Sequence, residues 1–539
     1  MTGLREAGLG RALRGFRFAS PLQGQTPSAL TLVPPNPWPG DATRGRTMLG
    51  GLIVLAGEAV TALGSPWNAD AHEPWFEAMH SFEWLRDLRA AGGDAARRHA
   101  RLLTSQWLDR RPRRGELAWR ADIMGVRLAN WIAFHDFFCA SAEDSFRTRL
   151  FASLARQARL LSRALPGDMT GAPLLFAIKG ALASAACLEG GEQRFVLAER
   201  LLIRELPRQI LADGCHVERS PAVHAAVLGA LIDIRALYKA ARLAMPEILQ
   251  HAIDRMTPAL RFFRHGDGGL ALFNGSQEGE PLLLDTIQTQ ADARGRPLKY
   301  APQAGFNRMS LGRTVIIVDS GAPAPSRLDR HAHAGIASFE MSVGRERFIV
   351  NCGAHPGVGP WRTALAATAA HSTLTVADTN QVELLTTGGV RRRPPSVEAR
   401  REDGPEGSLV EIQHSGYSGL GLNHHRRLFL GDSGEDFRGE DALIGSTPQR
   451  FAIRFHFHPD VQVSLTGTGH TALLKLGDGT GWRFRSDMES VKLEDSVYFG
   501  SGAAPRRSVA LVVSGRTEGD ETIVRWAFRR EKRTSPPSS

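Results

Sequence analysis

The hydrophobic period of the sequence changes near Gly305, and this change constrains the fold more than any other feature. From about Glu73 to Phe263, apolar residues recur three and four positions apart, which is the spacing of one face of an α-helix. Beyond Gly305, apolar and polar residues alternate, which is typical of strands with one buried face. The chain is therefore expected to be multidomain, with a helical part followed by an antiparallel β-sandwich.

Individual segments show both periods clearly. Ser220 suits a helix N-cap and Pro221 suits the first helical position. One apolar helix face follows, formed by Val223, Val227, Leu231, Ile234 and Leu237. An apolar strand face is formed by Phe451, Ile453, Phe455 and Phe457. Many helices with short connections predict helical hairpins packed in a ring or bundle.

Composition shifts divide the chain into five predicted segments. The run Pro34–Gly40 is too rich in proline to be helical, so the N-terminal part is expected to be an arm. The expected segments are a Pro/Gly/Arg-rich arm (1–66), a helical domain (67–280), a connector (281–304), a β-sandwich (305–531) and a disordered tail (532–539).

The charge of the chain favours an acidic partner. The formal net charge is +10 over 539 residues, and arginine binds carboxylate, sulfate and phosphate groups through two parallel N–H donors. No zinc-finger, RNP or basic-zipper pattern occurs, so nucleic acid is not the expected partner. The four cysteines lack CxxC spacing and are expected to be reduced and buried.

No segment predicts export or membrane insertion. The first twenty residues contain four arginines and no uninterrupted apolar core, so no cleavable signal peptide is expected. The apolar run Met48–Ala56 is too short to span a bilayer. The compartment stays open between cytoplasm and cell envelope, and a homodimer is left open as well.

Histidines in the second half suggest a site. His331 and His333 are two apart and point to the same side of an extended segment. Asn351 and His371 follow at distances that a folded sheet could bring close. Such a set could hold a metal and leave one imidazole for proton transfer. The alternative is a group of hydrogen-bonded histidines without metal.

These motifs resemble the heparinase II/III family of polysaccharide lyases. The resemblance covers about residues 75–530 and is strongest at 331–353, 370–373 and Asp213–Pro221. It implies an incomplete α/α toroid followed by a β-sandwich, and β-elimination at a uronic acid. That reaction needs a group that neutralises the sugar carboxylate, a base for the proton on C5 and an acid for the leaving oxygen.

The resemblance also implies roles for single residues. His331 matches the catalytic histidine of the family, and His333 and His371 match metal ligands. The remaining ligand is usually an aspartate, and Asn351 stands in its place. A divalent metal, by implication zinc, is therefore expected to bind more weakly than at a His2Asp site.

Two catalytic positions of the family are altered. Val223 stands where the family commonly has a tyrosine, and an Asn-His element is replaced near Gly171–Pro173. The predicted replacements for the catalytic groups are Tyr417 or His224 as the acid, with His216 as a further alternative, and Arg219 as the neutralising cation.

Further residues are predicted to bind substrate. Arg127, Asn130 and Trp131 share one face of a helix, and tryptophan with arginine suits sugar stacking near an acidic group. The alternative places Trp131 in the core. His216 and Glu218 are expected to contact substrate as well, whereas the alternative for Glu218 is an ion pair with Arg219 at a helix start.

The expected function is that of a lyase acting on acidic, uronate-containing polysaccharides. A non-catalytic protein that binds acidic glycans on the same scaffold is the second hypothesis, because two catalytic positions are altered. A metal-dependent glycan hydrolase ranks last, since no carboxylate pair is evident.

Overall fold

The computed structural model describes residues 26–531 except 63, 111–115, 294, 358, 468 and 503. The predicted arm (1–66) and tail (532–539) therefore lie partly or wholly outside the described residues. Contacts divide the chain into two compact units. The helical unit comprises Met1–Gln209 and Val227–Ile253, and the sandwich unit comprises Ile210–Ala226 and Asp254–Ser539. Each unit is described by itself.

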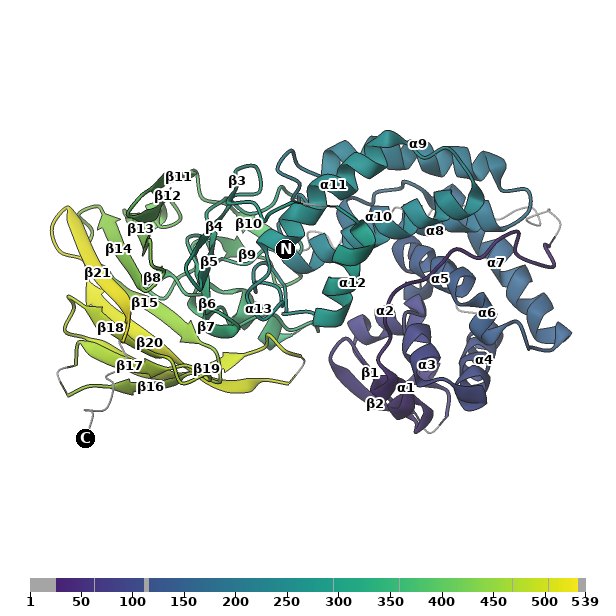
Figure 1. Cartoon of the computed structure of the whole chain (residues 1–539), viewed down its shortest axis with the longest axis horizontal. Coiled ribbons are helices and arrows are strands. Elements are labelled where there is room, and N and C mark those ends of the chain that lie inside the picture. Colours follow the sequence, from purple (N-terminus) through teal and green to yellow (C-terminus); the bar gives the residue numbers. More distant parts are fainter. Residues whose placement is uncertain are drawn as a thin grey trace, which may run out of the picture. The chain divides into compact units, whose positions relative to one another are not determined.

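The helical unit consists of α-helices and one β-hairpin (Figure 1). The hairpin pairs β1 (Leu52–Leu55) with β2 (Glu58–Thr61). The helices are α1 (Ala42–Leu49), α2 (Glu73–Ser81), α3 (Leu85–Ala91), α4 (Gly93–Arg110), α5 (Ala121–Ala133), α6 (His135–Phe138), α7 (Asp144–Ala164), α8 (Gly171–Cys187), α9 (Glu192–Gln209), most of α10 (Pro221–Ala241) and the start of α11 (Glu247–Phe262). The predicted helical first half is confirmed.

Two glycines let helices α5 and α8 approach closely. A Cβ atom on Gly180 would lie 2.1 Å from the carbonyl oxygen of Gly125, and one on Gly125 would lie 2.6 Å from the Cα of Ala177. Glycine inside a helix costs about 0.5–1 kcal/mol relative to alanine. Here it permits backbone contact that no larger residue allows.

Helix α10 begins at Pro221, as its sequence predicts, and its apolar face is buried at Val227, Leu231, Ile234 and Leu237. Among the described helices, it is long and apolar enough to cross a membrane, but 67% of its most apolar window is buried inside the protein. Such burial is what a core helix shows.

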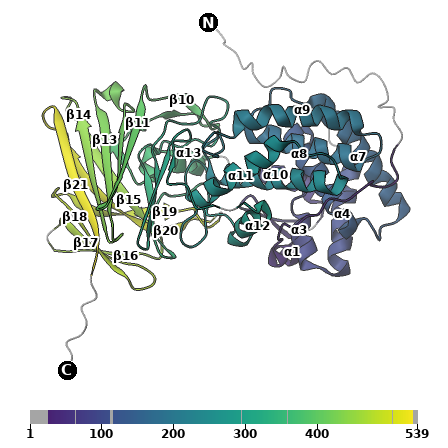
Figure 2. The ribbon, with the colours of Figure 1, turned by 45° about the horizontal axis from the view of Figure 1, so that its top comes forward.

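The sandwich unit contains two large antiparallel sheets (Figures 1 and 2). The first has eight strands in the order β11 (Val397–Gly404), β12 (Gly407–His414), β13 (Asn423–Gly431), β14 (Asp436–Ile444), β21 (Glu521–Arg530), β18 (Gly481–Ser486), β17 (Thr471–Lys475) and β16 (Gln462–Leu465). The second has nine strands in the order β19 (Val491–Tyr498), β20 (Arg506–Arg516), β15 (Arg450–Phe457), β7 (Glu346–Val350), β6 (Phe339–Val343), β5 (Thr314–Asp319), β4 (Phe306–Leu311) and β3 (Tyr300–Ala301), with β8 (Leu374–Val376) beside β15.

The inner faces of the two sheets share one hydrophobic core. Phe339 of β6 and Phe455 of β15 contact Trp526 of β21, with ring centroids 5.8 and 4.7 Å apart. Full burial of one such side chain stabilises the fold by about 1.5–3 kcal/mol. The predicted stripe on β15 belongs to this core, because Phe451, Ile453, Phe455 and Phe457 are all buried. The predicted antiparallel sandwich is confirmed.

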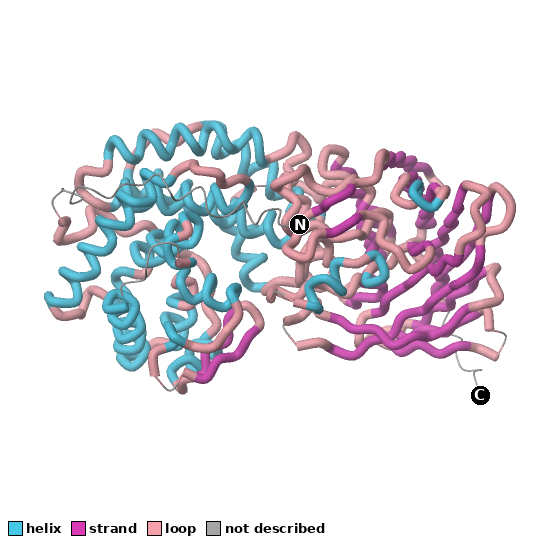
Figure 3. The backbone as a smooth tube through the Cα atoms, turned by 180° about the vertical axis from the view of Figure 1, so that it is seen from behind, coloured by secondary structure: helices cyan, strands magenta, loops and turns pink. Residues whose placement is uncertain are grey.

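The change from helices to strands falls within residues 281–304, the predicted connector. This connector is itself structured. It contains α12 (Pro281–Ala291) and β3 (Figure 3). Residues 254–280 also group with the sandwich rather than with the helices. The physical reason is Glu340 of β6, whose carboxylate accepts bonds from His265 (3.1 Å) and from the Leu272 backbone N–H (2.9 Å).

Candidate functional site

His331 and His333 lie in the loop between β5 and β6 of the sandwich unit. Backbone bonds hold this loop at several points. The N–H of Ala332 donates to the Asp329 carbonyl oxygen (2.9 Å), and that of Ala334 donates to Ala366 (2.8 Å). Asn274 accepts from the His333 N–H through Oδ1 (3.1 Å). The loop therefore presents both histidines in a defined conformation.

His331 is a neutral imidazole at physiological pH. Its side chain is half-buried, and burial together with Arg330 and Arg362 lowers its pKa to about 4. Each effect disfavours the imidazolium form. The fit around the ring is close, since a Cβ atom on Gly275 would lie 3.2 Å from the His331 Nδ1. A neutral imidazole can accept a proton, so His331 has the protonation state of a general base.

Two arginines, Arg330 and Arg362, lie near His331, and an exposed tryptophan precedes Arg362 in the same helix. Trp361 begins helix α13 (Pro360–Ala366) after its proline, is 42% exposed and packs against Phe499 at 4.9 Å between ring centroids. Arg362 donates through Nη2 to the carbonyl oxygen of Arg330 (3.2 Å). The run Pro360-Trp361-Arg362 could have indicated candidate binding residues, because it places an aromatic ring and a cation at a helix start.

The predicted metal ligands are close together, but they are joined by hydrogen bonds. His371 Nδ1 donates to the Ala367 carbonyl oxygen (2.8 Å), so its Nε2 is an acceptor. His333 Nδ1 donates to that Nε2 (3.1 Å), and His333 Nε2 accepts from the Gly275 N–H (3.1 Å). Because a carbonyl oxygen can only accept, the ring nitrogen that carries the proton is fixed in both His371 and His333.

This series of hydrogen bonds through His333 and His371 does not fit a bound zinc. A neutral imidazole cannot accept at Nε2 and also bind a metal at Nδ1, since both nitrogens would then need to lose their protons. Asn351 Oδ1 accepts from the Ser372 N–H (3.0 Å), and its Nδ2 is a buried donor, so Asn351 brings no charge that would offset the loss of His333 as a ligand. In the part of the chain that the structure describes, no three His, Cys, Asp or Glu side chains form a metal-binding group.

His216 and His224 are interior residues. His224 donates through Nε2 to the Met256 carbonyl oxygen (2.9 Å) and accepts from the His216 N–H through Nδ1 (3.3 Å). Burial lowers the pKa of His224 to about 4 and that of His216 to about 3. Glu218 is also buried, and its N–H donates to His216 Nδ1 (3.3 Å). The structure therefore places these three residues in the interior rather than at a substrate surface.

Arg219 forms a buried ion pair rather than a free cation. Its Nη2 lies 2.5 Å from Asp319 at the end of β5, and its Nε donates to Ala304 (2.5 Å). Its guanidinium also stacks on Phe306, 4.7 Å from the ring centroid. The backbone φ of Arg219 is +58°, and Asn274 donates to its carbonyl oxygen (3.0 Å). Asp319 already neutralises this guanidinium.

Tyr417 lies in the sandwich core and is 1% exposed. Its hydroxyl donates to the Leu374 carbonyl oxygen (2.7 Å), and burial strongly raises its pKa. The prediction that Tyr417 supplies the leaving-group proton is not supported by this placement. Tyr238 and Tyr498 also donate to internal acceptors, Glu199 and Glu278 respectively.

The predicted substrate residues of helix α5 belong to the core of the helical unit. Arg127 donates to Gln157 (2.8 Å) and to the carbonyl oxygens of His80 (3.0 Å) and Ala118 (2.8 Å). Burial lowers the pKa of Arg127 to about 9. Trp131 is fully buried, and Asn130 donates to Ser81 (2.9 Å). Arg127 and Trp131 have no surface left for a glycan.

Comparison with known sequences decides the family. Residues 82–292 match the profile described as heparinase II/III N-terminus, and residues 293–527 match heparinase II/III-like, C-terminal. This chain belongs to the heparinase II/III family. The sequence resemblance on the histidine motifs is thereby confirmed.

Relatives of this heparinase II/III chain are found among sequences and structures. FtsZ-localized protein C of Caulobacter vibrioides (strain NA1000 / CB15N) is 31% identical over 533 residues, covering 94% of this chain and 91% of that protein. A crystal structure of heparinase III matches with TM-score 0.72 at 15% identity, covering 87% of this chain and 79% of that chain. Chondroitin AC lyase of Streptomyces coelicolor A3 matches with TM-score 0.55 at 12% identity, covering 91% and 79%. At these identities the structural matches establish the fold alone.

Within this heparinase II/III scaffold, His331 is the predicted catalytic residue that the structure leaves accessible. Val223, at the position of the family tyrosine, is a half-buried residue of α10. The sandwich unit thus combines an available base with arginines and an exposed aromatic ring, while the predicted acids Tyr417 and His224 are engaged internally.

Proposed function

We propose that this protein recognises acidic glycans at the His331 loop of a polysaccharide-lyase scaffold. The observation that carries the proposal is the half-buried His331 with two arginines near it: Arg330 precedes it in the chain, and Arg362 donates to the Arg330 carbonyl oxygen (3.2 Å). The described structure thus brings two cations and an imidazole together in the sandwich unit, and the exposed Trp361 precedes one of these cations in α13.

Each of these groups suits an acidic sugar. Guanidinium groups bind carboxylate and sulfate with directed N–H donors. An indole ring offers a flat apolar face against which the C–H surface of a sugar ring can pack. The net charge of +10 adds long-range attraction for a polyanion. Binding is accordingly expected to weaken as salt concentration rises.

Elimination is the second candidate, and the neutral His331 favours it. With its pKa near 4 the imidazole is unprotonated at neutral pH and could take the C5 proton of a uronate. The reaction also needs a proton for the leaving oxygen. Tyr417 and His224, the predicted donors, are buried in internal hydrogen bonds. Binding without turnover is therefore the function that the geometry supports best.

Two measurements on the full chain test the proposal. Binding is measured by calorimetry against uronate-containing polysaccharides and a neutral glucan, and elimination is followed by the ultraviolet absorbance of the unsaturated product. We expect salt-sensitive binding of the acidic polymers only. Arg330→Ala should weaken it by about tenfold, whereas Arg242→Ala, an arginine of the α10–α11 loop, should not. Equal binding of acidic and neutral glycans would reject the proposal.

The elimination assay separates the two candidates. Product formation that disappears in His331→Ala while glycan binding persists would make the protein a lyase. Binding with no unsaturated product from any uronate polymer would make it a glycan-binding protein on a lyase fold.

The relative named FtsZ-localized protein C supports a proposal on location. Because that protein is 31% identical over nearly the whole chain, we infer that this chain localises with FtsZ too. A fluorescent fusion that is spread evenly through dividing cells would contradict this inference.

A further inference from the structure

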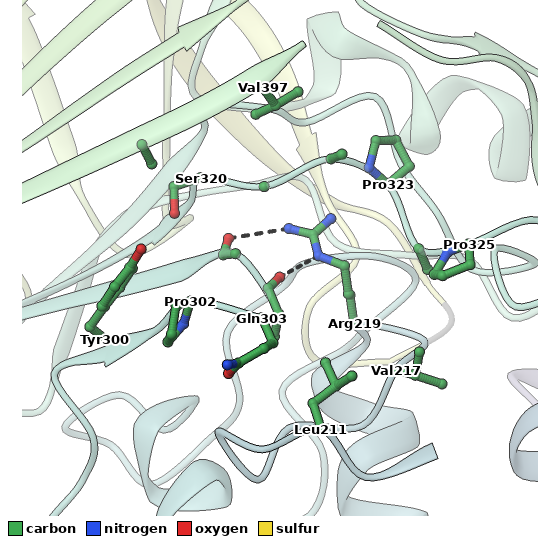
Figure 4. Close-up of a pocket in the computed structure, with 16 residues that line it drawn as sticks. Leu211, Val217, Arg219, Tyr300, Pro302, Gln303, Ser320, Pro323, Pro325 and Val397 are labelled. Carbon is green, nitrogen blue, oxygen red and sulfur yellow. Dashed lines mark hydrogen bonds between the residues drawn. The ribbon is translucent and has the colours of Figure 1, made fainter. Parts of the chain in front are cut away.

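A cavity of about 340 Å³ lies in the sandwich unit beside the buried side chain of Arg219 (Figure 4). Its walls come from the turn after β3, from residues 320–325 after β5, and from the edge strand β11 through Val397 and Ala399. This volume is at the small end of the range for ligand sites. The cavity therefore suits a small ligand, of the size of one sugar residue.

One nitrogen of Arg219 has no partner. Nε donates to Ala304 (2.5 Å), and Nη2 donates to Gly305 (3.2 Å) and Asp319 (2.5 Å). No residue that the structure describes accepts a bond from Nη1, although Arg219 is only 6% exposed. In Figure 4 this nitrogen carries no dashed line and points toward Pro323. Because Arg219 lines the cavity, this N–H is free to donate to an acceptor of a ligand there.

Two hydroxyl groups add donors to the same cavity. The Ser320 Oγ accepts from Asn307 Nδ2 (2.9 Å), so its own proton remains available to another acceptor. Tyr300, 40% exposed, forms part of the wall, and in Figure 4 its hydroxyl end lies on the side of Ser320. The donors Arg219, Ser320 and Tyr300 together suit a ligand with a carboxylate and further oxygens.

The remaining wall is mostly apolar, with the amide of Gln303 as a further polar group. Pro302, Pro323 and Pro325 contribute proline rings, and Tyr300 contributes an aromatic face. Such surfaces pack against the C–H groups of a sugar ring. Because Asp319 already offsets the charge of Arg219, attraction comes from directed N–H donors rather than from net charge. Binding in the cavity should thus depend only weakly on salt.

We propose that this cavity binds one acidic sugar residue, with its carboxylate on Nη1 of Arg219 and its ring against Tyr300 and the prolines. The inference goes beyond the proposed function, because the cavity lining contains none of His331, Arg330, Trp361 or Arg362. A peptide with a free C-terminal carboxylate is the competing occupant, and the experiment distinguishes the two.

The test uses saturation-transfer NMR on the full chain with glucuronate, glucose and a short peptide that has a free C-terminus. Ala322→Trp fills the cavity from an exposed wall position, and Ala152→Trp on the exposed face of α7 is the matched control. Arg219→Lys keeps a charge beside Asp319 and removes Nη1. We expect glucuronate to bind the wild type and Ala152→Trp, and about tenfold more weakly to Arg219→Lys and Ala322→Trp.

Several outcomes would overturn the proposal. Unchanged glucuronate binding in Ala322→Trp would do so, even if Arg219→Lys fails to fold. If glucose binds as tightly as glucuronate, the carboxylate has no role in binding. If only the peptide binds, the cavity is a site for that peptide and not for a sugar. Trp361→Ala separates this site from the His331 region. If glucuronate binding is lost in Trp361→Ala but retained in Ala322→Trp, the cavity proposal is rejected and the proposed function stands.

Discussion

At the scale of single residues, hydrogen-bond partners decide which polar side chains can act on a ligand. Tyr417, His224 and Arg219 each resemble functional groups in the sequence, yet each is buried and bonded to a distant part of the chain. His331 differs from them, because it is half-buried and lies close to the cations Arg330 and Arg362. Accessibility therefore separates His331 from the other candidates.

Tyr417→Phe tests the structural role of this tyrosine. The change removes the hydroxyl that donates to Leu374 and leaves that buried carbonyl oxygen without this bond. The free energy of unfolding should fall by about 1–2 kcal/mol, measured by urea denaturation, while glycan binding stays unchanged. A loss of glycan binding or of elimination at unchanged stability would instead restore Tyr417 as a functional residue.

Asn351→Asp tests the metal prediction. The buried Nδ2 of Asn351 has no partner among the described residues, so aspartate would place an unpaired carboxylate oxygen there. We expect this variant to lose about 1–3 kcal/mol of stability, and added zinc should not restore it, because His333 still uses both ring nitrogens in hydrogen bonds. The wild type should show the same melting temperature with zinc or with chelator. Stoichiometric zinc in the wild type as purified would contradict the hydrogen-bonded arrangement and support the zinc site that the sequence predicts.

At the scale of elements, close backbone approach explains residues that propensity alone disfavours. Helices α5 and α8 touch through Gly125 and Gly180, where a single methyl group would meet backbone atoms. The loop with His331 shows a related feature: Arg426 of β13, paired with Asp441 of β14 at 2.6 Å, donates to the carbonyl oxygens of Ala337 (2.9 Å) and Ser372 (3.0 Å). The core thus holds the loop through backbone atoms.

Gly180→Ala should separate α5 from α8. The new Cβ would lie 2.1 Å from the Gly125 carbonyl oxygen, which requires a shift of the helices and costs about 1–3 kcal/mol. Thermal unfolding followed by circular dichroism measures the effect. Gly404→Ala serves as the control, because a Cβ atom there meets nothing within 4 Å. Equal melting temperatures for the two variants would refute the close approach.

At the scale of the whole molecule, buried neutral histidines make stability depend on pH. Burial lowers the pKa to about 3 for His216 and His456 and to about 4 for His224 and His371. The unfolded chain, with histidine pKa values near 6.5, binds more protons than the folded chain between about pH 6.5 and 4. Stability is thus full above pH 6.5 and is lost as the pH falls through this range.

The expected slope is steep because several histidines act together. Each fully buried histidine removes up to about 1.4 kcal/mol per pH unit between the two pKa values. Urea unfolding at pH 7, 6 and 5 should show a falling free energy of unfolding. His224→Gln, which cannot be protonated, should flatten the slope relative to the wild type. A free energy of unfolding that is constant over this range would contradict the buried neutral state.

The sequence by itself determined the architecture and the position of one accessible candidate residue, His331. The change of period near Gly305 predicted helices followed by an antiparallel sandwich, because each period reflects which side chains face a core within one element. The Ser220-Pro221 start of α10 and the stripe on β15 are local in the same sense. The family and the accessible His331 followed from short motifs whose residues are near one another in the chain.

Only the tertiary structure decided the roles of the other polar residues. Arg219 meets Asp319 one hundred positions away, and His333 meets His371 across thirty-eight. Such partners determine whether a side chain has its hydrogen bonds, carries a charge or is open to a ligand. The spacing of residues in the sequence does not predict these partners. Trp361 and the Arg219 cavity were missed for the same reason: exposure and enclosed volume arise from packing between segments that are distant in sequence.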